Sequence, residues 1–262
     1  MSPAQRYVSK ELTHFVGKNL PTTEDQYSLL VKILTSGWLT HPPHNPNVSA
    51  NLVVNGKARI SENEMYSPQV ICFSDIPAGD LDVHIGKYSR FGLSFLKSFL
   101  VRKGANPVFY IARNSTVSVP NDLSDRNRRK EAFERSRTIG PEAFSDRVPR
   151  AAYFDKMIGE YHDLVLTLFQ QQQDPSGVPA DFHRFFDLRR FLDFHIFSFL
   201  KFFDDAKSDE DPENYYMERE WRMLGNLNFK LDDVRRVILP ESYATPLRKD
   251  VPDYAGQLTF VD

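Results

Sequence analysis

The chain has 262 residues and a formal net charge of -2 at pH 7, so no overall field draws it to nucleic acid or to a membrane surface. Its length allows one large domain or two small ones. A single cysteine, Cys72, excludes an internal disulfide and a multi-cysteine zinc site. The polar N-terminus lacks the apolar segment of a secretion signal, and no apolar run is long enough to span a bilayer. We therefore expect a cytoplasmic protein without membrane contact.

The first part of the chain predicts a strand and then a helix. β-prone residues over 12–16 form a short strand that ends at Gly17. The helix is expected to start at Thr22 or Thr23, because acidic residues follow in its first turn and apolar residues recur at helical spacing. Gly37 is a typical residue just past a helix end, and the chain is expected to continue in extended form after it.

Residues 52 to 112 predict short strands around one helix. A hairpin arm is expected over 52–60, around an Asn-Gly pair that favours a tight turn. The other elements expected here are a buried strand over 70–75, a strand over 91–95, a helix over 97–103 and a strand over 107–112.

Composition changes after residue 121, where Arg and Glu become frequent. Long helices are expected over 153–172 and 181–204, and strands over 215–224 and 234–240. We therefore predict an α+β fold whose β-rich segments pair across a mostly helical insertion. The predicted parts are 1–120 for the N-terminal part of the core, 121–213 for the insertion and 214–262 for the strands that complete the core.

The stretch from Tyr215 to Leu224, Y-Y-M-E-R-E-W-R-M-L, is the strongest candidate site. Successive side chains of a strand point to opposite faces, so Glu218, Glu220 and Arg222 would share one face. Two carboxylates beside a guanidinium are what a catalytic or binding cleft needs. The alternative is an amphipathic edge strand with a row of surface ion pairs.

Metal binding and cysteine chemistry have weaker support. His41, His44, Cys72 and His84 are residue types that bind zinc, but their spacing matches no known finger, so no metal is expected. Cys72 lies inside an apolar run, where cysteine acts as a small hydrophobe rather than as a nucleophile.

Two further segments have more than one interpretation. The basic run 126–130 can contact the phosphates of a nucleic acid, or it can be one solvated face of a helix. The segment 181–204 is dense in phenylalanine, which is typical of a core or of an interface with a partner protein.

Several words of the sequence, taken in order, resemble the AbiGi family, the antitoxin side of a two-gene abortive phage resistance system. The words are T-H-F-V-G, I-L-x-S-G-W-L-T-H-P-P, C-F-S-D-I-P, H-x-x-K-Y-x-R-F-G-L-S-F, G-A-N-P-V-x-Y and E-x-E-W-R. The resemblance covers most of 7–112 and 215–240. It implies a partner, a nucleotidyltransferase-like toxin encoded beside this chain.

A more distant resemblance is to the ADP-ribosyltransferases. It rests on a His in the first strand, a helix ending in I-L-x-S-G-W-L, a Tyr in the middle of the chain and a late Glu-x-Glu. It implies an ADP-ribosyltransferase-like, mixed or antiparallel β core and NAD as the substrate. In that superfamily the late glutamate binds the nicotinamide ribose and stabilises the positive charge that develops as nicotinamide leaves.

This second resemblance implies roles for six residues of this chain. Glu220 would stabilise the developing charge, Glu218 would orient the nucleophile, and Tyr88 would stack on nicotinamide. His14 would bind the adenosine ribose. Arg90, which is not part of the superfamily pattern, is a candidate for the pyrophosphate, and Arg222 is expected to hold a carboxylate in place. The implied catalytic set is Glu220, Glu218 and Tyr88, and the implied cofactor-binding set is His14, Arg90 and Arg222.

Three functions therefore compete. The first is a phage-defence enzyme that transfers ADP-ribose from NAD to a macromolecule, protein or nucleic acid, or that hydrolyses NAD. The second is a non-catalytic antitoxin that neutralises a toxin through the aromatic helical segment 153–203. The third is a nucleic-acid-binding defence protein that uses the basic run 126–130.

Overall fold

A mostly antiparallel sheet of seven strands is the centre of the molecule. The structure is a computed structural model, and it describes residues 9–41, 46–47, 51–120, 144–171, 180–208, 211 and 214–261. The strand order is β15-β14-β6-β1-β5-β12-β7, and only β14 and β15 of these described strands pair in parallel. The strands are β1 (Glu11–Phe15), β5 (Val70–Ser74), β6 (Gly92–Leu96), β7 (Asn106–Pro107), β12 (Glu220–Leu224), β14 (Val234–Leu239) and β15 (Gln257–Phe260).

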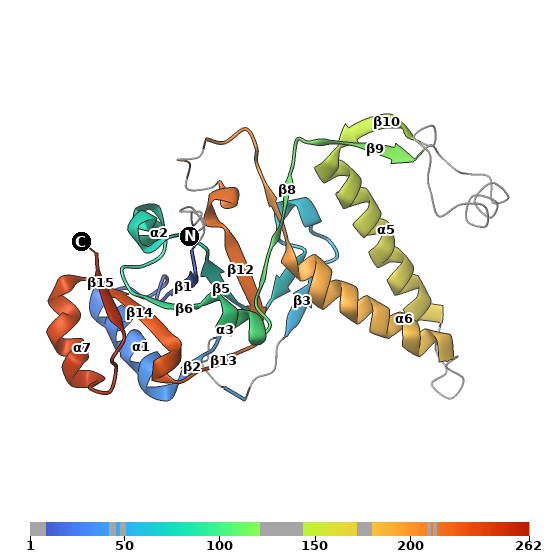
Figure 1. Cartoon of the computed structure of the whole chain (residues 1–262). Helices are drawn as coiled ribbons and strands as arrows, with labels where there is room; N and C mark the ends of the chain where they lie inside the picture. The colour runs from blue at the N-terminus through green and yellow to red at the C-terminus, as the bar shows by residue number, and fades with distance from the viewer. Residues whose placement is uncertain are drawn as a thin grey trace, which may run out of the picture.

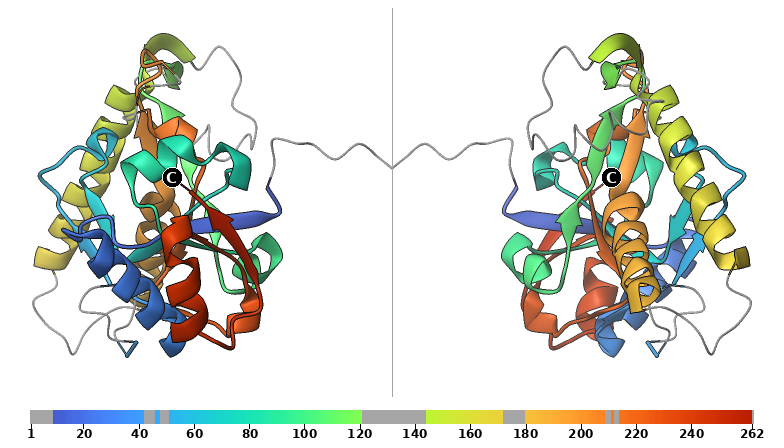
Figure 2. Two further views of the ribbon diagram at one scale, coloured as in Figure 1. Left: turned by 90° about the vertical axis from the view of Figure 1, so that its left-hand side faces the viewer. Right: turned by 90° about the vertical axis from the view of Figure 1, so that its right-hand side faces the viewer.

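The first helix forms as its sequence predicts. Helix α1 (Thr23–Ser36) is capped by Thr22, whose hydroxyl accepts a hydrogen bond from the backbone N–H of Asp25. It ends at Gly37, which has a φ of 69°. Figure 2 shows α1 beside α7 (Ala244–Asp250), and the hydroxyl of Tyr27 donates a hydrogen bond to Asp250 across that contact.

The main hydrophobic core lies between the sheet and α1. Alternate residues of the strands point into it, and the strands predicted over 12–16, 70–75 and 91–95 are confirmed as β1, β5 and β6. The fully buried side chains of this cluster include Leu12, Leu30, Phe91, Leu93, Phe95 and Met223. The residues between them along the strands point to the other face of the sheet. Among these, Thr13 and Ser74 are polar.

A helical arm extends from the sheet (Figure 1). It contains α5 (Arg150–Gln171) and α6 (Ala180–Phe191), which follow the hairpin β9 (Thr116–Pro120) and β10 (Phe144–Pro149). The chain enters the arm through β8 (Phe109–Ala112) and leaves it through β11 (Leu200–Phe203), and these two strands pair in parallel. The arm and the core are therefore joined by a two-strand stem.

A second hydrophobic cluster fixes the base of the arm to the core. Phe202 of β11 is fully buried in it with Ile60, Tyr66 and Ile111. The side chain of Asn63 bonds both the backbone N–H and the carbonyl of Phe202, at 2.8 and 2.9 Å. These contacts hold β11 in a fixed place beside the sheet.

Some predicted elements were wrong in type or extent. The helix expected over 181–204 ends at Phe191, continues as a π-helical turn over Leu192–Ile196 and then becomes strand β11. The strand expected over 107–112 is two strands in different sheets, β7 and β8. The hairpin of β3 (Leu52–Val54) is closed by β4 (Tyr66–Pro68), beyond the predicted limit.

The remaining short elements complete the described fold. They are β2 (Trp38–Leu39) paired with β13 (Leu227–Asn228), α2 (Asp82–Lys87) and α3 (Lys97–Arg102). Within the described part of the chain, no helix combines the length and the apolar character needed to cross a membrane. The limits of the three parts predicted from the sequence stay a prediction.

Candidate functional site

The alternation of residues 215–224 predicted one continuous strand, and this prediction is wrong. Tyr215–Glu218 is a turn of 3₁₀ helix, and Arg219 follows with a φ of 45°. That left-handed conformation is unfavourable for a residue with a Cβ, and here it ends the turn and starts β12 at Glu220. Glu218 therefore comes from a turn and Glu220 from a strand.

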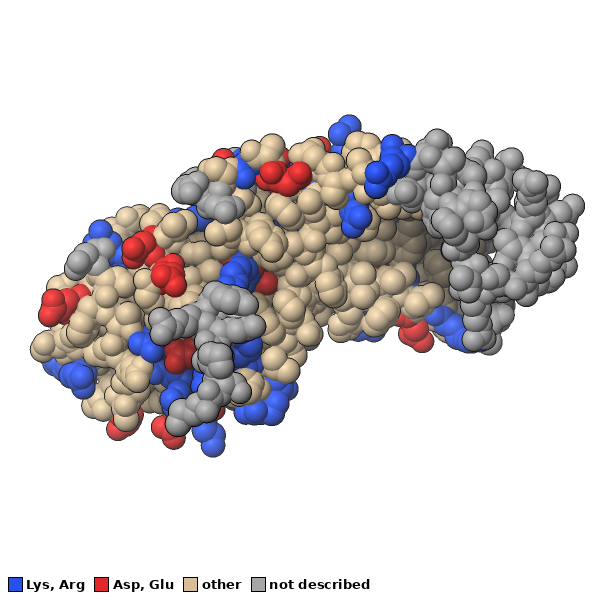
Figure 3. Space-filling view, turned by 45° about the horizontal axis from the view of Figure 1, so that its top comes forward, with Lys and Arg blue, Asp and Glu red and all other residues tan. Residues whose placement is uncertain are grey.

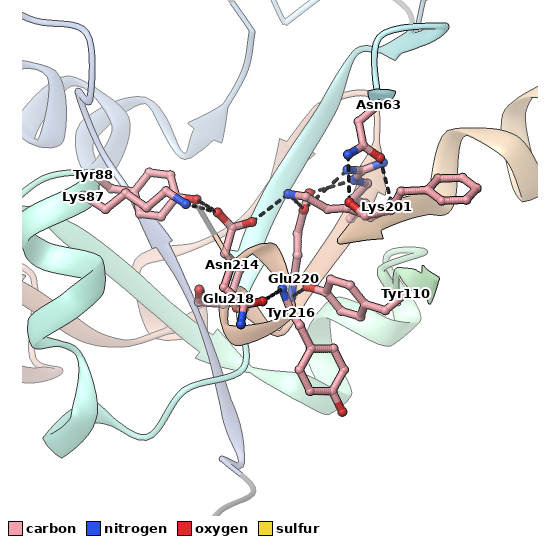
Figure 4. A network of polar contacts seen from close by, with 12 residues as sticks. Asn63, Lys87, Tyr88, Tyr110, Lys201, Asn214, Tyr216, Glu218 and Glu220 are labelled. Carbon is pink, nitrogen blue, oxygen red and sulfur yellow. Dashed lines mark hydrogen bonds and ion pairs between the residues drawn. The ribbon is translucent and has the colours of Figure 1, made fainter. Parts of the chain in front are cut away.

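A lysine from the arm brings the two carboxylates together. The ammonium of Lys201, on β11, lies 2.6 Å from Glu218 Oε2 and 2.6 Å from Glu220 Oε2. Figure 4 shows this lysine between the two acids. This role of Lys201 was not predicted from the sequence, although a lysine inside the apolar run L-K-F-F was a visible signal.

The other carboxylate oxygens also have cationic partners. Glu218 Oε1 accepts hydrogen bonds from Lys87, at 2.6 Å, and from the hydroxyl of Tyr88. Glu220 Oε1 accepts one from the guanidinium of Arg222, at 2.7 Å. Each oxygen of the acidic pair thus has a donor from a charged side chain, and we call Glu218, Glu220, Lys87, Lys201 and Arg222 the ion cluster.

The ion cluster keeps both acids charged. Burial opposes ionisation of Glu220, but Arg222 and Lys201 outweigh it and lower its pKa to about 2. Burial also opposes ionisation of Glu218, yet Lys201, Lys87 and Tyr88 lower its pKa. Burial lowers the pKa of Lys201 less than the two acids raise it, so the lysine stays protonated.

Backbone contacts fix the geometry of the cluster. The backbone N–H of Glu220 donates to the hydroxyl of Tyr110 at 2.6 Å, and Ser74 Oγ donates to the carbonyl of Glu218 at 3.1 Å. Arg222 also donates from Nη2 to Glu220 Oε2 at 3.4 Å and from Nη1 to the carbonyl of Ser198, in the segment that connects α6 to β11. These contacts therefore link strand β12 to β8 and to the residues just before β11, the two strands of the stem.

A cavity of about 260 Å³ opens beside the cluster. It is lined by Tyr88, Lys201, Glu218 and Glu220, with Lys18 at 4.6 Å from the ring of Tyr88. Small-molecule sites usually measure roughly 300–1,000 Å³, so this cavity is slightly smaller than the usual range. The carboxylate oxygens that would accept the ribose hydroxyls of NAD are already bonded.

His14 lines this cavity but its imidazole is used elsewhere. The register pairs Glu220 with Ser74 and Ser74 with Thr13, so these three side chains share a face and His14 falls on the alternate one. Its Nδ1 lies 2.8 Å from the carbonyl of Cys72. Burial lowers the pKa of His14, only partly offset by that hydrogen bond, which favours a neutral ring.

The structure does not bring every predicted residue to the cavity. Arg90 is exposed and is not one of the residues that line it. Arg222 holds Glu220, as expected, and lines a separate cavity. Cys72 borders the cavity and is exposed, so the buried cysteine expected from its apolar run is wrong. Desolvation by the surrounding protein, and then Glu220, raise the pKa of its thiol, which disfavours a nucleophilic thiolate.

Two other hypotheses from the sequence concern a metal site and the basic run 126–130, and the described residues do not cover either of them completely. In that part of the chain, no three His, Cys, Asp or Glu side chains gather in a way that would hold a metal ion, and His44 lies outside it. The basic run 126–130 also lies outside the described residues.

The fold and the site define an α+β protein with a buried ion cluster at the join of a core sheet and a helical arm. Residues 47–252 match the family model described as "Putative abortive phage resistance protein AbiGi, antitoxin". The chain belongs to this family, as its sequence words predicted. Neither the curated proteins nor the solved structures gave a match.

Proposed function

We propose that this chain is an antitoxin of abortive-infection phage defence, and that it acts by binding a partner toxin rather than by catalysis. The observation that carries this proposal is that both acids of the ion cluster are fully paired with cationic side chains. All four carboxylate oxygens of Glu218 and Glu220 accept hydrogen bonds from Lys87, Lys201 or Arg222. A carboxylate that must stabilise a developing cation needs a free oxygen at that place. The family description, which names an antitoxin, supports the same function.

The arm offers a surface for such a partner. Large apolar side chains of α5 and α6 are exposed, among them Met157, Leu164, Leu166, Leu188 and Phe191. On the face that Figure 3 draws, a stretch of surface between the core and the arm is without Lys, Arg, Asp and Glu. Exposed apolar surface of this kind is typical of protein-binding regions. The partner implied by the resemblance is a nucleotidyltransferase-like toxin encoded beside the chain.

A growth assay tests the antitoxin function. The toxin gene is expressed in bacteria with this chain, with Leu164→Asp, or with Tyr88→Phe. Leu164 is 64% exposed, so Leu164→Asp should fold and should lose protection if the arm binds the toxin. Tyr88→Phe removes one hydroxyl from the cluster and should protect as well as the unaltered chain. Loss of protection by Tyr88→Phe alone would overturn a binding mechanism based on the arm.

A second candidate function is NAD-directed chemistry, the enzymatic alternative. The observation that favours it is that Tyr88, Glu218 and Glu220, far apart in the sequence, line one cavity. The core would then have an ADP-ribosyltransferase-like origin, and the acceptor would be a protein, a nucleic acid or water. Incubation of the full chain with NAD tests this candidate, since nicotinamide release would support it. No release under any condition would count against it.

A further inference from the structure

A cavity larger than the one beside the ion cluster lies between helix α1 and the sheet. Its volume is about 310 Å³, within the roughly 300–1,000 Å³ that is usual for small-molecule sites. Its apolar walls come from the segment after β1, from α1, from β2 and from β5. The side chains of these walls include Val16, Leu20, Leu29, Ile33, Leu39 and Ile71. Because these side chains are aliphatic, the walls suit the apolar part of a ligand.

A tight turn after β1 forms the side of this cavity that meets solvent. The backbone N–H of Leu20 donates to the carbonyl of Gly17 at 2.9 Å, and Lys18 and Asn19 are exposed at the tip of the turn. Gly17 has a φ of 84°, and a Cβ there would lie 2.9 Å from Cγ of Gln26 on α1. A glycine therefore lets this turn pass close to the helix, and Lys18 and Asn19 line the cavity beside it.

The polar side chains around the cavity add positive charge and no negative charge. They are His14, Lys18, Asn19, Thr40 and His41, and no Asp or Glu of the described residues lines the cavity. Burial lowers the pKa of His14, so the permanent charge is that of Lys18. Within the described part of the chain Lys18 forms no ion pair, and its ammonium lies 4.6 Å from the centre of the Tyr88 ring. An anion can therefore pair with this ammonium without displacing a carboxylate.

We propose that this cavity binds a small aliphatic carboxylate, whose chain packs against Leu29 and Ile33 and whose carboxylate pairs with Lys18. Aliphatic walls beside a positively charged rim carry this inference. A nucleotide or a sugar would place polar atoms against those walls, where unpaired polar groups cost free energy. A neutral apolar molecule would leave the ammonium without a partner. This site goes beyond the antitoxin function and does not use Glu218 or Glu220, which do not line the cavity.

Titration calorimetry of the purified full-length chain with two probes tests the class of ligand. Octanoate and 1-octanol have chains of the same length and differ in charge, and octanoate should bind more tightly. Lys18→Met keeps the aliphatic part of the side chain and removes its charge. It should bind octanoate about fivefold more weakly, as expected for one exposed ion pair, and 1-octanol with unchanged affinity. Lys57→Met, at an exposed lysine that does not line the cavity, should bind both probes like the unaltered chain.

A second variant tests the place of binding. Leu29 is half-buried on α1, so Leu29→Phe should fold while its larger ring fills part of the cavity. Both probes should then bind about tenfold more weakly, because an overfilled apolar site must shift to admit them. Circular dichroism checks that the variant folds. If it does not, Leu20→Phe, in the turn, replaces it with the same expected loss.

Several results would overturn this inference. No binding of octanoate, or equal binding of octanoate and 1-octanol by the unaltered chain, would remove the carboxylate as the ligand. Unchanged octanoate binding by Lys18→Met would show that the ammonium does not hold the anion. Unchanged octanoate binding by the folded phenylalanine variant would place the probe outside the cavity. Tighter binding of adenosine monophosphate than of octanoate would assign the cavity to a nucleotide instead.

Discussion

At the scale of single residues, the stability of the site depends on how the ion cluster holds Glu220. A buried ion pair often stabilises the folded protein no more than well-packed hydrophobic residues would. Removal of one partner, however, leaves the other charge buried and uncompensated, which destabilises the fold. Glu220 is buried, and its two cationic partners are buried or nearly so. Its ionisation is therefore coupled to the folding of the whole chain.

Acid unfolding measures this coupling. The folded-state pKa of Glu220, about 2, is lower than its ordinary value of 4.5, so its contribution to stability is complete above pH 4.5 and is lost as the pH falls to 2. At ~1.4 kcal/mol per pKa unit, the shift corresponds to about 3 kcal/mol. Urea unfolding should show Glu220→Gln to be less stable at pH 7 and to lose less stability between pH 5 and pH 2.

The control for this prediction is an exposed acid. Glu160→Gln on α5 removes a partner of Lys156 whose closest approach is 3.9 Å, between two largely exposed side chains. Such a pair is worth less than about 1 kcal/mol, so this variant should match the unaltered chain at both pH values. An identical pH profile for Glu220→Gln and the unaltered chain would contradict the assignment of Glu220 to a buried, ionised state.

At the scale of elements, the sequence predicts local structure where short-range rules dominate. The cap at Thr22, the stop at Gly37 and the strands β1, β5 and β6 were all predicted. It did not predict the turn before Glu220, because the residue with positive φ is Arg219 rather than Gly or Asn. Nor did it separate strand β11 from the helix before it, since a short apolar run is compatible with both.

The end of α1 allows a matched prediction. At Gly37, with φ 69°, a Cβ would lie 2.7 Å from the carbonyl oxygen of Phe229, whose N–H donates to Gly37. Gly37→Ala should therefore lower the free energy of unfolding by about 2–3 kcal/mol, through strain and a backbone clash. Gly104→Ala, at φ 98° with no atom within 4 Å, adds only the conformational strain, about 1 kcal/mol. Equal losses in chemical denaturation would contradict the close packing of α1 against residue 229.

At the scale of the whole molecule, the site depends on contacts that no local pattern contains. Lys201 lies near the end of the predicted insertion and Glu220 follows it, and both reach the cavity beside Tyr88 because β12 pairs with β5 while β11 pairs with β8. The acidic pair, Tyr88 and Arg222 could be selected from the sequence, but the other two ionic partners, Lys87 and Lys201, could not. Lys201 is on a strand that the sequence predicted to be helix, so its direction was not predictable.

The arm is the second feature that appears only at this scale. Its sequence is rich in phenylalanine, and the structure divides these residues between two places. Phe199 and Phe202 are buried at the base, whereas Phe169 and Phe191 are exposed on α5 and α6. This division supports an arm that is fixed at its base and apolar along its exposed length, as a partner-binding element requires.

The most direct test of the proposed antitoxin function is the affinity of the purified chain for its proposed partner, the toxin that the family description implies. The account predicts a tight complex for the unaltered chain and for Tyr88→Phe, and at least a hundredfold weaker complex for Leu164→Asp, measured by titration calorimetry. A charged group at the centre of an apolar interface costs about 3 kcal/mol or more, which corresponds to that factor. Equal affinities for the unaltered chain and Leu164→Asp, or no complex with the unaltered chain, would contradict the proposal that the arm binds the toxin.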